Sequence, residues 1–196
     1  MNVKKTMMAG LMGMAVLVPV KAQNVRILSE TGVTGDINKE LLYSGGLHAE
    51  ISSSKNTADF YGGMLVDSEK QFTFESQFEN EYSWTENLSS WIRETFHLSK
   101  RENNLTSEVA PIKVNKSFNK FDTSLAPVYI MQNDFKEHEN TQGVGMVLST
   151  IYNVDSDNAL KFEAEYSTEP AKNLFETRFG KLKDSISYVI SYLRKF

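Results

Sequence analysis

The sequence predicts an all-β protein: a single antiparallel up-and-down transmembrane β-barrel of about ten to twelve strands joined by short turns. Two observations lead to this fold class. Apolar and polar residues alternate with a period of two over almost the whole chain, which is the pattern of strands with one apolar face. No long helical pattern and no apolar run of membrane-helix length follows residue 20. A membrane-spanning barrel has this modest hydropathy, because only alternate residues face lipid.

The N-terminal residues have the composition of a secretory signal peptide. Lys4 and Lys5 precede an apolar segment rich in Met, Ala, Gly and Leu, and Ala22 offers a cleavage site. The alternative is an uncleaved anchor, but the apolar segment is shorter than the ~20 residues of a comfortable span. We therefore expect residues 1–22 to be a signal peptide and residues 23–196 to form one outer-membrane β-barrel domain.

The first half of the mature chain contains five segments that alternate as strands do. Each ends in a polar stretch that favours a turn, such as residues 53–57, 68–70 and 85–88. The expected strands lie at residues 25–27, 41–52, 58–67, 72–84 and 92–99.

The second half continues the pattern with two irregularities. Alternation is weak around Pro111 and is interrupted again at Pro127, because proline lacks the N–H that a ladder bond needs. The expected strands lie at residues 112–115, 125–131, 143–154, 160–166, 175–179 and 186–196. These make about eleven candidates, whereas a single-chain bacterial barrel has an even number. Ten strands follow if the Pro111 region is merged or does not span, and twelve if a poorly patterned strand lies near residues 32–40 or 100–120.

The last strand has one apolar face and one small or polar face, and the chain ends on an aromatic residue. The apolar face holds Ile186, Tyr188, Ile190 and Tyr192, the other holds Ser187, Ser191 and Lys195, and the last residue is Phe196. This segment resembles the C-terminal signal of Gram-negative outer-membrane β-barrels. The resemblance implies the cell outer membrane as the location, outer-membrane lipid as surroundings, and the barrel-assembly machinery as a partner that reads Phe196.

Aromatic residues gather near the predicted strand ends, as in the girdles that flank a membrane barrel. Filling the core of a soluble β-sandwich is the alternative role, since aromatic residues favour strands in any setting. The candidates for the membrane interface are Tyr43, Tyr82, Trp84, Trp91, Tyr129, Tyr152 and Tyr192.

Two glycine pairs, Gly45-Gly46 and Gly62-Gly63, interrupt neighbouring strands. Glycine normally weakens a strand, so a pair in each of two adjacent strands needs a reason. We expect the pairs to face each other across a hairpin, where they either allow tight curvature or leave space in the lumen.

The polar face carries many charges of both signs. In a dry interior they would have to pair, and in a wet pore they would tune selectivity; the sequence leaves both open. The pore-lining candidates are Arg26, Glu50, Asp59, Glu75, Glu79, Arg93, His97, Lys113, Lys161, Glu163 and Arg178.

Composition and motifs argue against several functions. The formal net charge is −4 and no cysteine is present, so nucleic acid is a poor partner and no thiolate metal site or thiol nucleophile exists. His97-Leu98-Ser99 resembles the His-x-Ser element of outer-membrane lipid A deacylases, with Glu108 at a distance that would orient the histidine. The residues that follow Ser99 do not continue that family's pattern. We expect no catalytic residue, metal or cofactor.

Short turns and a charged lumen favour a small porin for passive diffusion of small hydrophilic solutes. The architecture is similar to that of narrow porins that pass acidic oligosaccharides, which implies an anionic solute. The basic track for that solute would be Arg26, Arg93, Lys113, Lys161 and Arg178. The alternatives are a closed barrel that stabilises the outer membrane and a soluble periplasmic β-barrel that binds a ligand.

Overall fold

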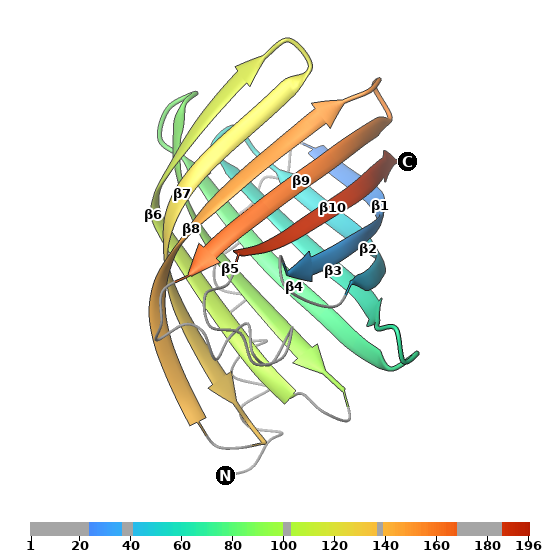
Figure 1. Ribbon diagram of the computed structural model, residues 1–196. Helices are drawn as coiled ribbons and strands as arrows, with labels where there is room; N and C mark the ends of the chain where they lie inside the picture. Colours follow the sequence, from blue (N-terminus) through green and yellow to red (C-terminus); the bar gives the residue numbers. More distant parts are fainter. Residues whose placement is uncertain (1–23, 37–40, 100–102, 137–138, 168–185) are drawn as a thin grey trace.

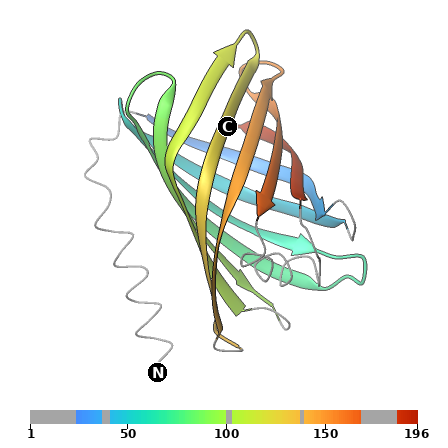
Figure 2. The same cartoon turned by 60° about the vertical axis from the view of Figure 1, so that its left-hand side comes forward.

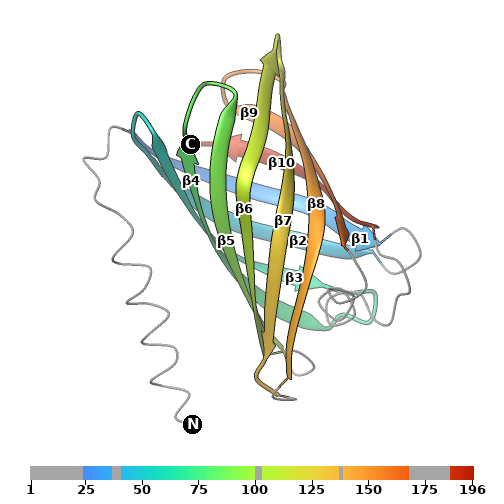
Figure 3. The same ribbon diagram turned by 90° about the vertical axis from the view of Figure 1, so that its left-hand side faces the viewer.

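Ten antiparallel strands close into one barrel (Figures 1–3). The computed structural model describes residues 24–36, 41–99, 103–136, 139–167 and 186–196. Each strand pairs with the next along the chain, and β1 pairs with β10 to complete the ring. The predicted all-β, up-and-down barrel is therefore confirmed, with the lowest strand number of the predicted range. Among the described residues, no helix is long and apolar enough to cross a membrane.

The strands contain between ten and sixteen residues each. Their bounds are β1 (Asn24–Asp36), β2 (Leu42–Ser52), β3 (Asn56–Val66), β4 (Phe72–Ser83), β5 (Leu88–Leu98), β6 (Asn103–Phe118), β7 (Phe121–Asp134), β8 (Glu139–Asn153), β9 (Asn158–Ser167) and β10 (Ile186–Lys195).

The Pro111 region forms a long spanning strand of its own, β6, so the prediction that ten strands require this region to merge or not to span is wrong. The register against β7 shifts between Val109 and Val114, so Pro111 lies in an irregular stretch where its missing N–H breaks no regular ladder. The expected strand at 175–179 lies outside the described residues, as does the expected signal peptide at 1–22.

The barrel is apolar outside and polar inside, the reverse of a soluble protein. Large apolar side chains of the outward register stay accessible, including Leu47 at 60% and Ile190 at 52%. Charged side chains of the inward register are buried, including Glu75 at 5% and Arg93 at 7%. A closed sheet with this distribution can face lipid, because every strand edge is paired and the outer wall is apolar.

Four short turns lie at the end of the barrel where the chain terminates. They join β2 to β3, β4 to β5, β6 to β7 and β8 to β9. In the last of them, the backbone N–H groups of Asp157 and Asn158 both donate to Asp155 Oδ1 at 2.9 Å. The bond from Asp157 and those from Asn158 hold the pKa of Asp155 below its ordinary value. These bonds hold the tight turn between β8 and β9.

The two glycine pairs meet across the β2–β3 hairpin, as the sequence predicts. Gly46 is the register partner of Gly63, and both occupy the inward register. The ring of Tyr61 lies where a Cβ on either glycine would be, whereas a Cβ on Gly62 would meet nothing within 4 Å. The inward glycines therefore make space for the Tyr61 ring, which also packs on His48 with ring centroids 4.7 Å apart.

We expect Gly46→Ala to destabilise the barrel by about 1–3 kcal/mol, since the added methyl group overlaps the Tyr61 ring. The measurement is the urea midpoint of the refolded protein in detergent micelles. Gly62→Ala is the matched control and should be near neutral. In a Tyr61→Ala background the Gly46→Ala penalty should shrink without vanishing, because the added Cβ would still lie 2.6 Å from the Gly62 carbonyl oxygen; a penalty of unchanged size there would contradict the contribution of the ring.

Candidate functional site in the barrel lumen

Six ionisable residues form one continuous row across the inner wall of β1 to β6. Each is the register partner of the next on the neighbouring strand. The row, which we call the charged row, is Arg26, Glu50, Asp59, Glu79, Arg93 and Glu108. All but the last are pore-lining candidates from the sequence. The arrangement follows from the two-residue period: once the hairpin registers are set, side chains of equal parity share a face.

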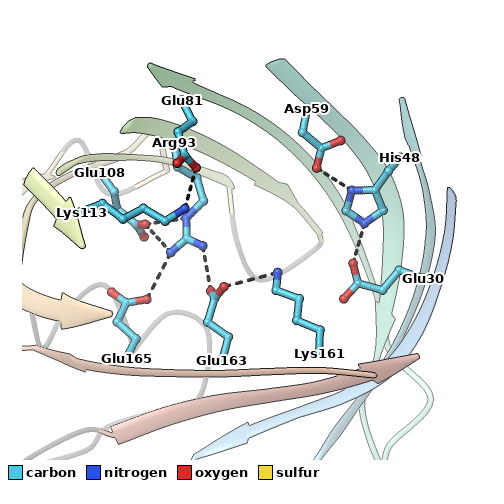
Figure 4. A network of polar contacts seen from close by, with 10 residues as sticks. All are labelled: Glu30, His48, Asp59, Glu81, Arg93, Glu108, Lys113, Lys161, Glu163 and Glu165. Carbon is cyan, nitrogen blue, oxygen red and sulfur yellow. Dashed lines mark hydrogen bonds and ion pairs between the residues drawn. The ribbon is translucent and has the colours of Figure 1, made fainter. Parts of the chain in front are cut away.

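Among the side chains drawn in Figure 4, Arg93 contacts three carboxylates. Its Nε and Nη2 donate to Glu108 Oε2 on the adjacent strand, at 2.6 and 2.5 Å. Its Nη1 donates to Glu163 Oε1 at 2.8 Å, and Nη2 lies 3.6 Å from Glu165 Oε2. The guanidinium also lies over the Trp91 ring, 4.9 Å from the centroid.

The contacts of Arg93 join two walls of the barrel that are not neighbours. Glu163 and Glu165 belong to β9, which is separated from β5 by β6, β7 and β8. Lys161, also on β9, lies with its Nζ 3.3 Å from Glu163 Oε2. The lumen is therefore crossed by an ion-pair bridge, whose members are Arg93, Glu108, Lys161, Glu163 and Glu165 (Figure 4).

A second cluster centres on His48 of β2. Its Nε2 lies 2.5 Å from Glu30 Oε2, and its Nδ1 lies 2.7 Å from Asp59 Oδ2. An imidazolium, with two N–H donors, satisfies both carboxylates.

Two smaller pairs lie elsewhere on the inner wall. His97 contacts Glu75 through Nε2 at 3.2 Å and Asn104 through Nδ1 at 3.1 Å. Lys113 Nζ donates to Glu81 Oε2 at 2.6 Å. The cationic side chains of the bridge, the His48 cluster and these pairs each contact at least one carboxylate.

A polar cavity of about 600 Å³, including the solvent at its mouth, lies inside the barrel. It reaches both the ion-pair bridge and the His48 cluster. Its charged lining residues are Glu30, His48, Glu75, Arg93, Glu108, Lys161 and Glu163.

One sector of the inner wall is apolar and packed. Ile130 is fully buried, and Val128 and Val147 are nearly so. They form a cluster with Trp91, Ala110 and Ala126 on β5 to β8. The interior is therefore divided into a dry apolar sector and a charged sector that faces the cavity.

The register places the described pore-lining candidates on the inner wall. Arg178 lies outside the described residues. Glu30, Glu81, Glu108 and Glu165 also face inward and were not among the candidates. The sequence pattern does not identify Glu30, because it predicts a first strand that ends near Ile27. The strand β1 in fact continues to Asp36, and its second half has too few apolar residues to show the alternation.

The prediction that Trp91 belongs to a membrane-interface girdle is wrong. Trp91 shares the parity of Arg93, faces inward and is 5% exposed, in the apolar cluster. Trp84, its expected companion, is 64% exposed at the strand end and donates to Ser90 Oγ at 3.1 Å. The remaining interface candidates occupy outward register positions, and their place in a girdle stays a prediction: Tyr43, Tyr82, Tyr129, Tyr152 and Tyr192.

Glu108 is not placed to orient the histidine of the deacylase-like motif. Glu108 binds Arg93, and His97 is held by Glu75 and Asn104 instead. No group of three or more His, Asp or Glu side chains in the described part of the chain is placed to hold a metal ion.

The chain resembles outer-membrane β-barrels of the small porin-like type in its closed barrel and apolar outer wall. No protein-family model matches it, and no curated protein sequence does. Among solved structures it is similar to the KdgM porin in complex with disordered oligogalacturonate, with 11% identity over 87% of this chain and 99% of that chain and a TM-score of 0.39.

Two further solved structures are similar at the same distant level. One is the N-terminal β-barrel domain of Pseudomonas aeruginosa OprF, with 9% identity over 90% of this chain and 100% of that chain and a TM-score of 0.39. The other is OmpT of Vibrio cholerae, with 15% identity over 79% of this chain and a TM-score of 0.33; this chain spans 56% of its length. The fold assignment rests on the ten-strand barrel itself.

Replacing Arg93 with alanine should destabilise the barrel by about 3 kcal/mol, because three inward carboxylates lose their shared cation. The matched control is Arg26→Ala in the same charged row. Its pair with Glu50 is 3.8 Å long and its side chain is 54% exposed, so the change should be below about 1 kcal/mol. Urea midpoints of the two variants in the same detergent check the difference, and equal midpoints would refute the structural role of the bridge.

Proposed function

We propose that this chain is a narrow outer-membrane pore for passive diffusion of small hydrophilic solutes. The proposal includes export through the signal peptide at 1–22 and insertion by the barrel-assembly machinery, which would read the C-terminal strand that ends in Phe196. The observation that best supports a pore is the polar, charge-lined cavity inside a closed barrel.

The ion-pair bridge supports a narrow rather than a wide pore. Arg93 reaches from β5 to Glu163 on β9, so its guanidinium occupies space between non-adjacent walls. The packed apolar sector around Ile130 fills a further part of the lumen. A solute must pass between these two features, through a passage lined by hydrogen-bonding groups, which favours small polar molecules and ions.

A closed barrel that stabilises the outer membrane is the second candidate. The same bridge favours it, because Arg93 and Glu163 link the two walls and would block the lumen if they never separate. The exposed apolar outer wall opposes the third possibility, a soluble periplasmic barrel, since a soluble protein rarely leaves so much contiguous apolar surface in water.

The pore and the closed barrel differ in conductance. We expect the purified protein to give stepwise currents in planar lipid bilayers. The double variant Arg93→Ala/Glu163→Ala should give larger steps, since it removes the cross-lumen pair. Lys113→Ala, which breaks a pair between β6 and β4 on the same side of the barrel, is the control and should change the step size less. A silent wild type with a conducting double variant would favour the closed barrel.

The location is tested by fractionation of cells that express the full chain. We expect the protein in the outer-membrane fraction, soluble only in detergent, with a compact band that shifts on boiling in SDS. Phe196→Ala should reduce the folded, heat-modifiable form, because Phe196 is proposed to be the assembly signal. Tyr166→Ala, which also removes an exposed outer aromatic residue, serves as the control. Wild-type protein released without detergent would contradict membrane insertion.

A further inference from the structure

We propose that the lumen selects cations over anions. This inference rests on the proposed pore and specifies its solute class. The proposal rests on two features of the inner wall: its basic side chains are paired with carboxylates, and carboxylates are in excess. The sequence instead predicts a basic track for an anionic solute.

The described members of that track are already engaged by carboxylates. Arg93 contacts three of them and Lys161 contacts Glu163. Lys113 donates to Glu81, and Arg26 faces Glu50 at 3.8 Å near one rim. An anionic solute would have to displace these carboxylates, which are held by charge-assisted bonds at fixed positions.

Carboxylates are also in excess. Among the described residues of the charged row, the ion-pair bridge, the His48 cluster and the two smaller pairs, the acids outnumber the Arg and Lys residues even when both histidines are counted as cations. The acidic set is Glu30, Glu50, Asp59, Glu75, Glu79, Glu81, Glu108, Glu163 and Glu165, and the cationic set is Arg26, His48, Arg93, His97, Lys113 and Lys161. The described part of the inner wall therefore carries more acidic than basic side chains.

Part of this surplus lies in the charged row, next to His48 and Arg93, which line the cavity. Asp59 and Glu79 are adjacent register partners, so two carboxylates lie side by side on β3 and β4. Asp59 Oδ2 binds His48, but its Oδ1 is buried without a hydrogen-bond partner among the described residues. This oxygen has no direct contact with a described cation, so its negative charge acts on the lumen at a distance.

The low-dielectric wall strengthens this effect. A narrow cleft with apolar walls focuses the field of one sign of charge and concentrates counterions. Here the apolar sector around Ile130 and the surrounding lipid form those walls. Potassium and small ammonium compounds are thus favoured over chloride and acidic sugars.

The test is the reversal potential in planar bilayers across a gradient of KCl near 0.1 M. We expect a permeability ratio of potassium to chloride on the order of 10, since focused potentials of several kT enrich counterions at least that much. Raising both solutions toward 1 M, where the Debye length is about 3 Å, should bring the ratio closer to one.

Matched variants test whether removing an inward acid and removing an inward base change the permeability ratio in opposite directions. Glu79→Gln should lower the ratio and Lys113→Gln should raise it, because they remove an inward acid and an inward base. Glu86→Gln, in the exposed turn after β4, should leave it unchanged. Asp59→Asn is the second acid-removing variant if Glu79→Gln fails to give a heat-modifiable band. A current with a ratio at or below one overturns the selectivity and leaves the pore standing. The absence of any current overturns the pore and the selectivity with it.

Discussion

The closure of the sheet between β1 and β10 is the constraint on which the rest of the structure depends. In lipid, an unpaired strand edge would leave backbone N–H and C=O groups without partners, at a cost of several kcal/mol each. Nine register pairs, from Leu28 with Lys195 to Asp36 with Ser187, remove that edge. Gly32 contributes at this seam, because a Cβ there would lie 2.6 Å from the carbonyl oxygen of Ile190.

Closure also explains why a local pattern predicts so much. Once every strand has two neighbours, each residue has one of two environments, and parity alone decides which. The alternation of Phe72 to Tyr82 is therefore enough to assign Glu75 and Glu79 to the interior. Residue type is a poorer guide than parity: Trp91 has the character of an interface residue, but its parity places it inside, where it packs on Ala110 and beneath Arg93.

The contacts across the lumen could not be predicted from the sequence. Arg93 and Glu163 lie 70 residues apart, and their meeting requires the strand number, the stagger of the hairpins and the width of the barrel together. The full length of β6 around Pro111 was equally hidden, since an irregular stretch within one strand and a break between two strands have the same pattern in a single sequence. By contrast, the Gly46–Gly63 partnership followed from one hairpin and was predictable.

The balance of charges inside the barrel bears on whether the interior is dry. A buried carboxylate without a cation or hydrogen-bond donors is unfavourable by several kcal/mol, so a sealed interior would need its acids neutralised. Arg93 already serves three carboxylates and His48 serves two, so among the described residues the cations are used more than once and the acids still exceed them. Water and mobile cations can supply the additional partners. The charged sector is thus more stable when hydrated, and hydration is the condition that a pore needs along the same wall.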